Sequence, residues 1–206
     1  MTIRKTLFSL LLIIGLMLLG QVLFPITTFK FWELLNEKPN LVSPYPSGGS
    51  EILGVSVVNR DNFPAFVSDF KRTNPASYQE FSLTVPKIGL KEAKVKVDSN
   101  DLDKGPIHLP GSALPGERGN IFISSHSSVL FNNNFSRLTS LKVGDQVKVS
   151  ALGTEFVYQV IGIKSVDPTD LSVIQPPDSL GRYLSLMTCV PPGLNIKRLV
   201  VLAKLI

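Results

Sequence analysis

The 206-residue sequence is poor in the residues that form disulfides or bind metals, with one cysteine and two histidines. A single cysteine excludes an internal disulfide and any zinc site built from several cysteines, and two histidines argue against a histidine-rich metal centre. Charged residues make up only 18% of the chain and apolar residues 44%, which excludes disorder for most of its length. No internal repeat is present. The composition predicts one ordinary folded domain with appendages.

The charge pattern lacks the basic clusters that nucleic-acid-binding surfaces require. The net charge is +5 and the sequence pI is about 9.4, but no run of Lys or Arg exceeds two residues. Acidic residues are interleaved with the basic ones throughout. A nucleic-acid partner is therefore not expected. The pattern favours a moderately basic surface that faces an anionic envelope.

A long uncharged run near the N-terminus predicts a membrane anchor. Leu7–Phe24 reads LFSLLLIIGLMLLGQVLF, and as a helix of about 1.5 Å per residue it nearly spans a hydrocarbon core of about 30 Å. Arg4 and Lys5 precede it without an acidic residue. The positive-inside rule then predicts a cytoplasmic N-terminus and an exported remainder. We assign residues 1–25 to the cytoplasmic tip and the transmembrane helix.

Two alternatives to the anchor stay open, a cleaved signal peptide and a buried core helix. The apolar run is longer than a signal peptide requires and ends in Gln-Val-Leu-Phe-Pro, which lacks a small-residue cleavage site. A helix that is apolar on every face suits lipid better than the core of a small domain.

Residues 26–80 are assigned to a tether and a segment beside the main domain. Residues 36–50 are rich in Pro, Ser, Gly and Asn, which is typical of a flexible, exposed linker. Glu51–Val58 resembles a strand, and Phe63–Phe70 resembles a short helix that starts behind Asn62 and Pro64. The sequence leaves open whether this segment packs on the following domain or shields part of it.

Short segments with period-2 alternation predict a β-rich domain from residue 81 onward. The predicted strands are Phe81–Val85, Ala93–Val97, Ile121–Ile123, Val147–Val149, Phe156–Ile163, Tyr183–Met187 and Arg198–Ile206, with one helical turn at Asn132–Leu138. Gly and Pro turns separate these strands. The pattern indicates a small barrel or sandwich that is large enough to fold without disulfides.

Three reactive side chains stand at or near predicted strand ends. Cys189 closes one strand, and Arg198 opens the next strand nine positions later, so a hairpin brings both to the same rim. His126 follows another strand directly. Reactive groups are often placed at strand ends on a rigid scaffold. A lone cysteine can also be a small buried hydrophobe, so the residues alone leave catalysis and packing open.

Several motifs in order resemble the sortases, membrane-anchored cysteine transpeptidases of mainly Gram-positive bacterial surfaces. The matching pieces are Gly105-Pro-Ile-His-Leu-Pro-Gly111, Leu114-Pro-Gly-Glu-Arg-Gly-Asn120, the strand ending at His126, Leu141-Lys-Val-Gly-Asp145, Thr188-Cys189 and Arg198-Leu-Val-Val201. The order His, Cys, Arg also fits the family. The resemblance covers residues 81–206, which we assign to a sortase catalytic domain.

The resemblance implies a mainly β fold, a sortase-type closed β-barrel of about eight strands with short helices, preceded by one N-terminal transmembrane helix. It implies that Cys189 is the nucleophile, that His126 exchanges protons with it, and that Arg198 stabilises the oxyanion or holds the substrate. Thr188 would line the site and contact substrate. The resemblance implies no metal and no cofactor, and no acidic cluster suggests calcium.

The implied reaction cleaves an LPxTG-like sorting signal between Thr and Gly through a thioester acyl-enzyme. The acyl chain then passes to an amine on a cell-wall precursor or a pilin lysine. The implied location is the bacterial cell membrane, as a single-pass protein with an extracytoplasmic catalytic domain. The short loop between Cys189 and Arg198 favours the class C, D and E types over class A.

One residue and one short segment differ from common sortase patterns, and a second histidine matches only part of the family. Ser125 stands where many sortases have Gly before the histidine, which narrows the backbone approach without removing a catalytic group. His108 matches a histidine found in part of the family, and we interpret it as structural. Asp61-Asn62-Phe63 resembles the acidic-aromatic lid of pilin-assembling sortases but lacks its proline.

Two other functional classes remain as alternatives. An L,D-transpeptidase is also exported, β-rich and cysteine-dependent, but it has His and Gly before the cysteine, where this chain has Met187 and Thr188. The other alternative is a catalytically inactive, membrane-anchored barrel that serves as an interaction module. The presence of His126, Cys189 and Arg198 together argues against the inactive module.

Overall fold

The computed structural model describes residues 2–36, 51–52, 55–60, 63–66, 76–102, 105–127, 135–192 and 194–206. The chain forms two compact units, one from Met1 to Glu37 and the other from Lys38 to Ile206. Residues 37–50 of the predicted tether lie outside the described residues, as do Asp61 and Asn62 of the lid-like segment.

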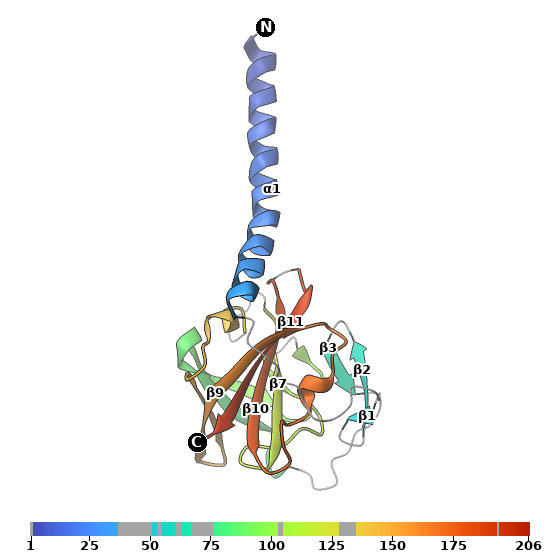
Figure 1. Cartoon of the computed structure of the whole chain (residues 1–206), viewed down its shortest axis with the longest axis vertical. Coiled ribbons are helices and arrows are strands. Elements are labelled where there is room, and N and C mark those ends of the chain that lie inside the picture. Colours follow the sequence, from blue (N-terminus) through green and yellow to red (C-terminus); the bar gives the residue numbers. More distant parts are fainter. Residues whose placement is uncertain are drawn as a thin grey trace. The chain divides into compact units, whose positions relative to one another are not determined.

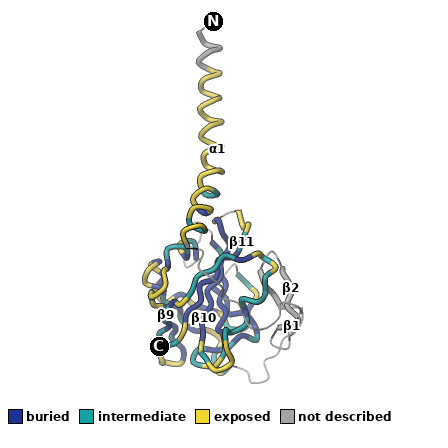
Figure 2. Tube along the Cα trace, in the orientation of Figure 1, coloured by how far each residue is buried: buried dark blue, intermediate teal, exposed yellow. Residues whose placement is uncertain are grey.

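The first unit is a single helix, α1 (Thr2–Asn36), which continues well past the predicted span. Its segment Leu7–Leu35 has a mean hydropathy of 2.6, and none of its most apolar window is buried. Figure 1 shows α1 as one continuous helix, and Figure 2 shows its residues exposed over most of this length. By length and composition, α1 is therefore a candidate to cross a membrane.

The second unit begins with a small antiparallel sheet of three short strands. They are β1 (Glu51–Ile52), β2 (Val55–Arg60) and β3 (Phe63–Phe66), in the order β1-β2-β3. The predicted short helix at Phe63–Phe70 is wrong over its first four residues, because these residues pair with β2 as a strand. Pairing with a neighbouring strand overrides the local helix-start signals of Asn62 and Pro64. Residues 67–70 lie outside the described residues.

The predicted eight-stranded closed barrel is confirmed. Its strands are β4 (Glu80–Val85), β5 (Leu90–Lys96), β6 (Ile107–His108), β7 (Gly119–Ser124), β8 (Gln146–Ala151), β9 (Thr154–Val166), β10 (Arg182–Val190) and β11 (Lys197–Leu205). They close in the order β10-β11-β9-β8-β4-β5-β6-β7, and Figure 1 labels β7, β9, β10 and β11 of this barrel. Closure leaves the barrel without a free sheet edge.

Alternation decides which side chains fill the barrel. In β4 the buried residues are Phe81, Leu83 and Val85, and in β8 the same period buries Val147 and Val149. Strand β10 differs, because every residue from Tyr183 to Val190 is buried (Figure 2). A strand buried on both faces needs a second layer of packing outside the barrel wall.

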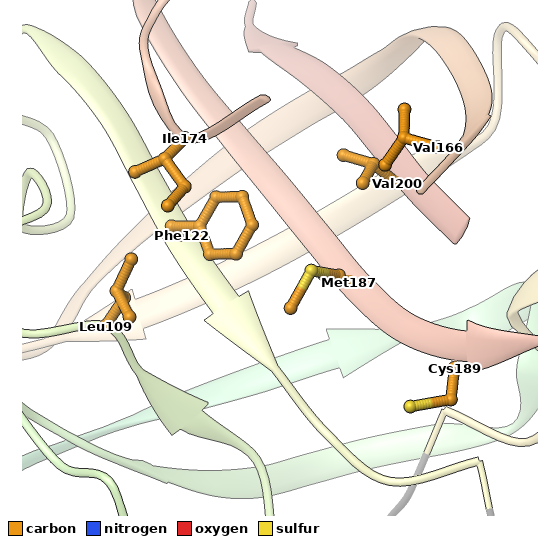
Figure 3. Packing of buried hydrophobic residues seen from close by; sticks show 7 residues of the cluster. All are labelled: Leu109, Phe122, Val166, Ile174, Met187, Cys189 and Val200. Carbon is orange, nitrogen blue, oxygen red and sulfur yellow. The ribbon is translucent and has the colours of Figure 1, made fainter. Parts of the chain in front are cut away.

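The second layer is an apolar cluster over one face of β7, β10 and β11. It contains Leu109, Phe122, Val166, Ile174, Met187, Cys189 and Val200 (Figure 3). Ile174 belongs to the short 3-10 helix η4 (Ser172–Ile174), and the Asn120 Nδ2 donates to the Ile174 carbonyl over 2.9 Å. This hydrogen bond fastens the loop between β9 and β10 to β7.

Other 3-10 helices among the described residues also join the strands. They include η1 (Pro86–Ile88) and η3 (Leu138–Ser140). The helical turn predicted at Asn132–Leu138 is found slightly later, since η3 begins at Leu138, while residues 132–134 lie outside the described residues.

Candidate active site

Strands β10 and β11 bring Cys189 and Arg198 together. The two residues are Cα partners in an antiparallel ladder that runs from the Tyr183–Lys204 pair to the Val190–Lys197 pair. Side chains of directly opposite residues project from the same face, with Cβ atoms about 4.5–5.5 Å apart. The hairpin geometry predicted from the nine-residue separation is therefore present.

His126 approaches the same end of β10 from the other side. Strand β7 runs parallel to β10, and its last residue, Ser124, is paired with Met187. Beyond the ladder, the Ser125 N–H donates to the Met187 carbonyl over 3.1 Å. His126 comes next, half-buried, and its carbonyl accepts from the Phe135 N–H over 3.0 Å. His126, Cys189 and Arg198 thus come from three adjacent chain segments at one end of the barrel.

Cys189 is almost completely enclosed. Its side chain is 2% exposed and belongs to the apolar cluster, next to Met187 on the same face of β10 (Figure 3). Burial raises the pKa of the Cys189 thiol, and the positive charge of Arg198 lowers it by a smaller amount. The burial effect is the larger one, so the net shift of the thiol pKa is upward.

Arg198 is the largest of the fully buried side chains, at 1% exposure. Its Nη1 donates to the Lys197 carbonyl over 2.9 Å and to the Asn195 carbonyl over 3.3 Å. Asn195 has a φ of 53°, in the left-handed region, so the turn itself is shaped to supply this carbonyl. Burial lowers the pKa of Arg198, and a Cys189 thiolate would partly reverse that shift. Backbone oxygens thus hold the guanidinium of the residue paired with Cys189.

Thr188 ties β10 to the segment that carries His126. Its side chain is 1% exposed, and its Oγ1 donates to the Ser125 carbonyl over 2.8 Å. Alternation puts Thr188 on the opposite face of β10 from Cys189. These contacts support a positioning role for Thr188, and they do not test the expected contact with substrate.

The second histidine has a different environment. His108 is 0% exposed, and its Nε2 lies 2.9 Å from the Ala113 carbonyl and 2.8 Å from Ser112 Oγ. Its Nδ1 lies 3.3 Å from Asp98 Oδ1, and its ring packs edge-on against Phe81. A carbonyl only accepts, so Nε2 carries a hydrogen. The surroundings of His108 fit the structural role expected for it.

Ser124 is a buried polar residue that the sequence analysis did not single out. Its side chain is 3% exposed, and its Oγ has no hydrogen-bond partner among the described residues. Period-2 alternation from Phe122 places Ser124 on the face of the apolar cluster. That alternation is the one signal in the sequence that could have identified it.

The described part of the chain contains no group of three or more His, Cys, Asp or Glu side chains that could hold a metal ion. What the three gathered residues offer is a thiol, an imidazole and a guanidinium. Such a set can supply a sulfur nucleophile, a proton acceptor and a group that stabilises negative charge.

Comparison with protein families places these residues in a known context. A family model described as "Sortase domain" matches residues 83–206. Sortase D of Bacillus subtilis (strain 168) is 34% identical over 110 residues, which cover 53% of this chain and 53% of that protein. Sortase A of Bacillus anthracis is 27% identical over 125 residues, covering 60% and 58% respectively. The chain thus spans little more than half the length of these curated relatives.

Solved structures with the same fold include sortases of more than one class. A pilus-related Sortase C of Group B Streptococcus superposes with a TM-score of 0.57 and 33% identity, covering 64% of this chain and 69% of that one. A lid mutant of Sortase A from Corynebacterium diphtheriae gives a TM-score of 0.58 and 28% identity, covering 63% and 70%. The resemblance inferred from the sequence motifs is confirmed.

Proposed function

This chain belongs to the sortase family, and we propose that it is a cysteine transpeptidase that cleaves an LPxTG-like sorting signal. The observation that carries the proposal is the pairing of Cys189 with Arg198 on adjacent strands, beside the strand end that bears His126. Family membership leaves the L,D-transpeptidase alternative without support.

Cys189 is the proposed nucleophile. Burial raises the pKa of its thiol and so disfavours the thiolate, and the sulfur loses a proton as it attacks the peptide carbonyl. His126 is the proposed acceptor of that proton. It then gives the proton to the departing amine, and a thioester joins the substrate acyl group to Cys189. In the second half-reaction His126 takes a proton from the incoming amine, which attacks the thioester. The carbon–sulfur bond breaks, and the departing sulfur takes that proton from His126, which restores the Cys189 thiol.

Arg198 is the proposed stabiliser of negative charge. The attack converts the carbonyl oxygen into an oxyanion, and a buried guanidinium beside the sulfur stabilises that charge more than it would in water. Two backbone carbonyls hold the guanidinium in place before substrate arrives. Thr188 is proposed to position the His126 segment, with its expected substrate contact as a further part of the proposal.

The proposed substrates are exported proteins with a C-terminal sorting signal, and the proposed acceptor is an amine on a cell-wall precursor or a pilin. The likeness to a Sortase D and to a pilus-related Sortase C supports the class C, D or E assignment. Helix α1 is the proposed single-pass anchor, with the N-terminus in the cytoplasm and residues 81–206 outside as the catalytic domain. No nucleic acid, metal or cofactor takes part in the proposed reaction.

The test is mass spectrometry of the detergent-solubilised full chain with an LPxTG-type peptide library and an amine acceptor. The proposal expects a peptide adduct on Cys189 and, after the amine is added, a peptide–amine product. Cys189→Ala is the matched control, because the chain has no other thiol. A folded protein that forms neither adduct nor product with any library peptide would instead favour the inactive interaction module.

A further inference from the structure

Ser124 is a buried polar residue that the proposed mechanism leaves unused. Its side chain is 3% exposed, and its Oγ has no hydrogen-bond partner among the described residues. A buried hydroxyl without a partner is uncommon in folded proteins, because folding removes it from water and gives no hydrogen bond in return. Ser124 thus keeps a hydrogen-bond donor that the fold itself does not use.

Strand register puts Ser124 on the same face of the sheet as Cys189. Ser124 on β7 is the Cα partner of Met187 on β10, and Cys189 follows Met187 by two residues. Residues two apart on one strand project from the same face. Neighbouring strands lie about 4.8 Å apart and two residues rise about 6.6 Å, so the Cβ atoms of Ser124 and Cys189 are about 8 Å apart. The gap between the hydroxyl and the sulfur therefore has room for one small side chain.

The neighbours of Ser124 on the sheet are apolar. Ile107 is paired with it on β6, Met187 is paired with it on β10, and Phe122 lies two residues before it on β7. All three are at most 3% exposed. Ser124 is as enclosed as Cys189, which is 2% exposed. A peptide that reaches the sulfur therefore comes within reach of the Ser124 hydroxyl as well.

A second serine on the same face has a hydrogen-bond partner. Ser185 is the Cα partner of Phe122 and lies two residues before Met187, so it faces the apolar cluster, as Ser124 does. Its side chain is 0% exposed, and its Oγ donates to Asn120 Oδ1 over 3.1 Å. The fold supplies a partner for the serine far from the sulfur and, within the described part of the chain, none for the serine near it.

The arrangement around the sulfur indicates which substrate group meets Ser124. In the proposed reaction the acyl carbon carries an oxygen, the departing amine and the Cα of the residue before the scissile bond. Arg198 is the proposed partner of the oxygen, and His126 is the proposed partner of the amine. Strand β10 lies between β11 and β7, so Ser124 is on the opposite side of β10 from Arg198. The residue before the scissile bond is the substrate group that remains for Ser124.

We propose that Ser124 is a specificity-determining residue whose hydroxyl donates a hydrogen bond to the side-chain Oγ1 of the substrate threonine. The inference rests on the proposed function, in which an LPxTG-like signal is cleaved after its threonine. Threonine suits this place because its methyl group can pack on the apolar cluster while its hydroxyl meets Ser124. A site that hydrogen-bonds a substrate hydroxyl disfavours the analogue that lacks it.

The test is a competition between the best LPxTG-type peptide of the library and its LPxVG counterpart. Valine has the shape of threonine with a methyl group in place of the hydroxyl. Both peptides are offered together, with an amine acceptor, to the detergent-solubilised full chain, and mass spectrometry gives the ratio of the two peptide–amine products. Because both peptides compete for the same enzyme molecules, a loss of folded protein in a variant cancels from this ratio.

Two serine variants are compared with the wild-type chain. Ser124→Ala removes the proposed donor, and Ser185→Ala is the matched control, because it removes a buried hydroxyl of the same face that already has a partner. The wild-type chain is expected to favour the threonine peptide by about tenfold, the effect of one hydrogen bond to a buried group. Ser124→Ala should lower this preference at least about fivefold, and Ser185→Ala should leave it unchanged.

The possible failures of the inference and of the proposed function give different results. A preference in Ser124→Ala within about twofold of wild type, even with slower turnover of both peptides, would overturn the inference and leave the proposed function intact. Equal use of both peptides by the wild-type chain, or an equal fall of the preference in both serine variants, would do the same. If no library peptide reacts with the wild-type chain, the proposed function fails and the inference fails with it.

Discussion

Cys189 and Arg198 face each other across the β10–β11 ladder, and both side chains are at most 2% exposed. Their burial shifts the pKa values of the two groups in opposite directions. It disfavours the thiolate and it disfavours the guanidinium cation, while their mutual attraction favours both charged forms. In the proposed mechanism the pair stabilises negative charge when it appears at or beside the sulfur, more than it maintains a thiolate at rest.

Arg198→Ala is expected to lower kcat by about 10²–10³, the usual effect of losing one donor to an oxyanion. The change should also reduce the free energy of unfolding by about 1–3 kcal/mol, since Arg198 is buried and two carbonyls lose their donor. Turnover must therefore be measured well below the melting temperature of the variant. Arg198→Lys should restore activity only in part, because an ammonium lacks the planar fork.

Lys197→Ala is the matched control for Arg198. Lys197 precedes it in β11, so its side chain leaves the strand on the other face, and the carbonyl that Arg198 uses is retained. Activity close to wild type is expected. Equal losses of kcat in both alanine variants, or full activity in Arg198→Ala, would contradict the proposed role.

The alkylation rate of Cys189 is expected to rise with pH around a midpoint above that of a free cysteine thiol, about 8.5. Burial raises the pKa of the thiol, so the reactive thiolate appears later. The measurement is the pH dependence of iodoacetamide labelling in the folded chain, with the urea-unfolded chain as the reference. In Arg198→Lys the midpoint should stay near wild type, and loss of the charge in Arg198→Ala should raise it further.

The same shift predicts how Cys189 affects stability. The pKa of the folded thiol is raised above its unfolded value, so its contribution is fully present below the unfolded pKa and is lost as the pH rises through the folded pKa. Cys189→Ala should consequently reduce the alkaline loss of stability. A labelling midpoint below that of the unfolded chain would contradict both statements.

Alanine substitutions of the two histidines are expected to have different effects. His126→Ala should slow acyl-enzyme formation and its resolution by about 10²–10⁴, because both half-reactions move a proton. His108→Ala should reduce the free energy of unfolding by about 1–3 kcal/mol, because it leaves Ala113 and Ser112 without their ring partner. Denaturant unfolding and acylation rates distinguish the two. A greater loss of acylation in folded His108→Ala would reverse the assignment.

Tyr183→Phe is expected to lower the free energy of unfolding at neutral pH and to lower it less in acid. The Tyr183 hydroxyl donates to Asp178, which holds the pKa of that carboxyl below its usual value and raises the pKa of Tyr183 to about 12. A lowered carboxyl pKa contributes stability above the unfolded pKa that is lost as the pH falls through the folded pKa. The measurement is the unfolding free energy against pH.

Tyr158→Phe provides the control for Tyr183. The Tyr158 hydroxyl accepts from the Gly116 N–H over 3.5 Å, and burial is the main cause that raises its pKa. Because no carboxylate among the described residues is its partner, the cost of Tyr158→Phe should not change in acid. A difference between wild type and Tyr183→Phe that stays constant down to the acid transition would exclude the Asp178 bond as its source.

Much of the barrel could be predicted because alternation is a local signal. Strands such as Phe81–Val85 and Val147–Val149 show it directly, and the short Cys189–Arg198 separation fixes a hairpin register. Strand β6 was missed since two residues are too few to show a period. The parallel pairing of β7 with β10 joins segments more than sixty residues apart, which no local pattern encodes.

The sequence predicts which residues form the candidate site more fully than it predicts the chemical state of those residues. The residue types and their order make Cys189, His126 and Arg198 the candidate site residues. The direction of the Cys189 pKa shift depends on the apolar cluster, which Leu109, Phe122 and Ile174 supply from distant parts of the chain. Burial by this cluster outweighs the effect of the neighbouring Arg198 charge.

Ser124→Ala is expected to raise the free energy of unfolding by about 1 kcal/mol. The Ser124 Oγ is buried and has no hydrogen-bond partner among the described residues, so folding removes it from water without compensation. Alanine keeps the Cβ and removes the uncompensated oxygen. Urea unfolding measures the change.

Ser112→Ala is the matched control. Ser112 is 0% exposed, but its Oγ donates to the Leu109 carbonyl and accepts from the Phe122 N–H. That variant should lose stability. The changes in the free energy of unfolding must have opposite signs in the two variants. A loss of stability in Ser124→Ala as large as that in Ser112→Ala would mean that the Ser124 hydroxyl has a hydrogen-bond partner in solution.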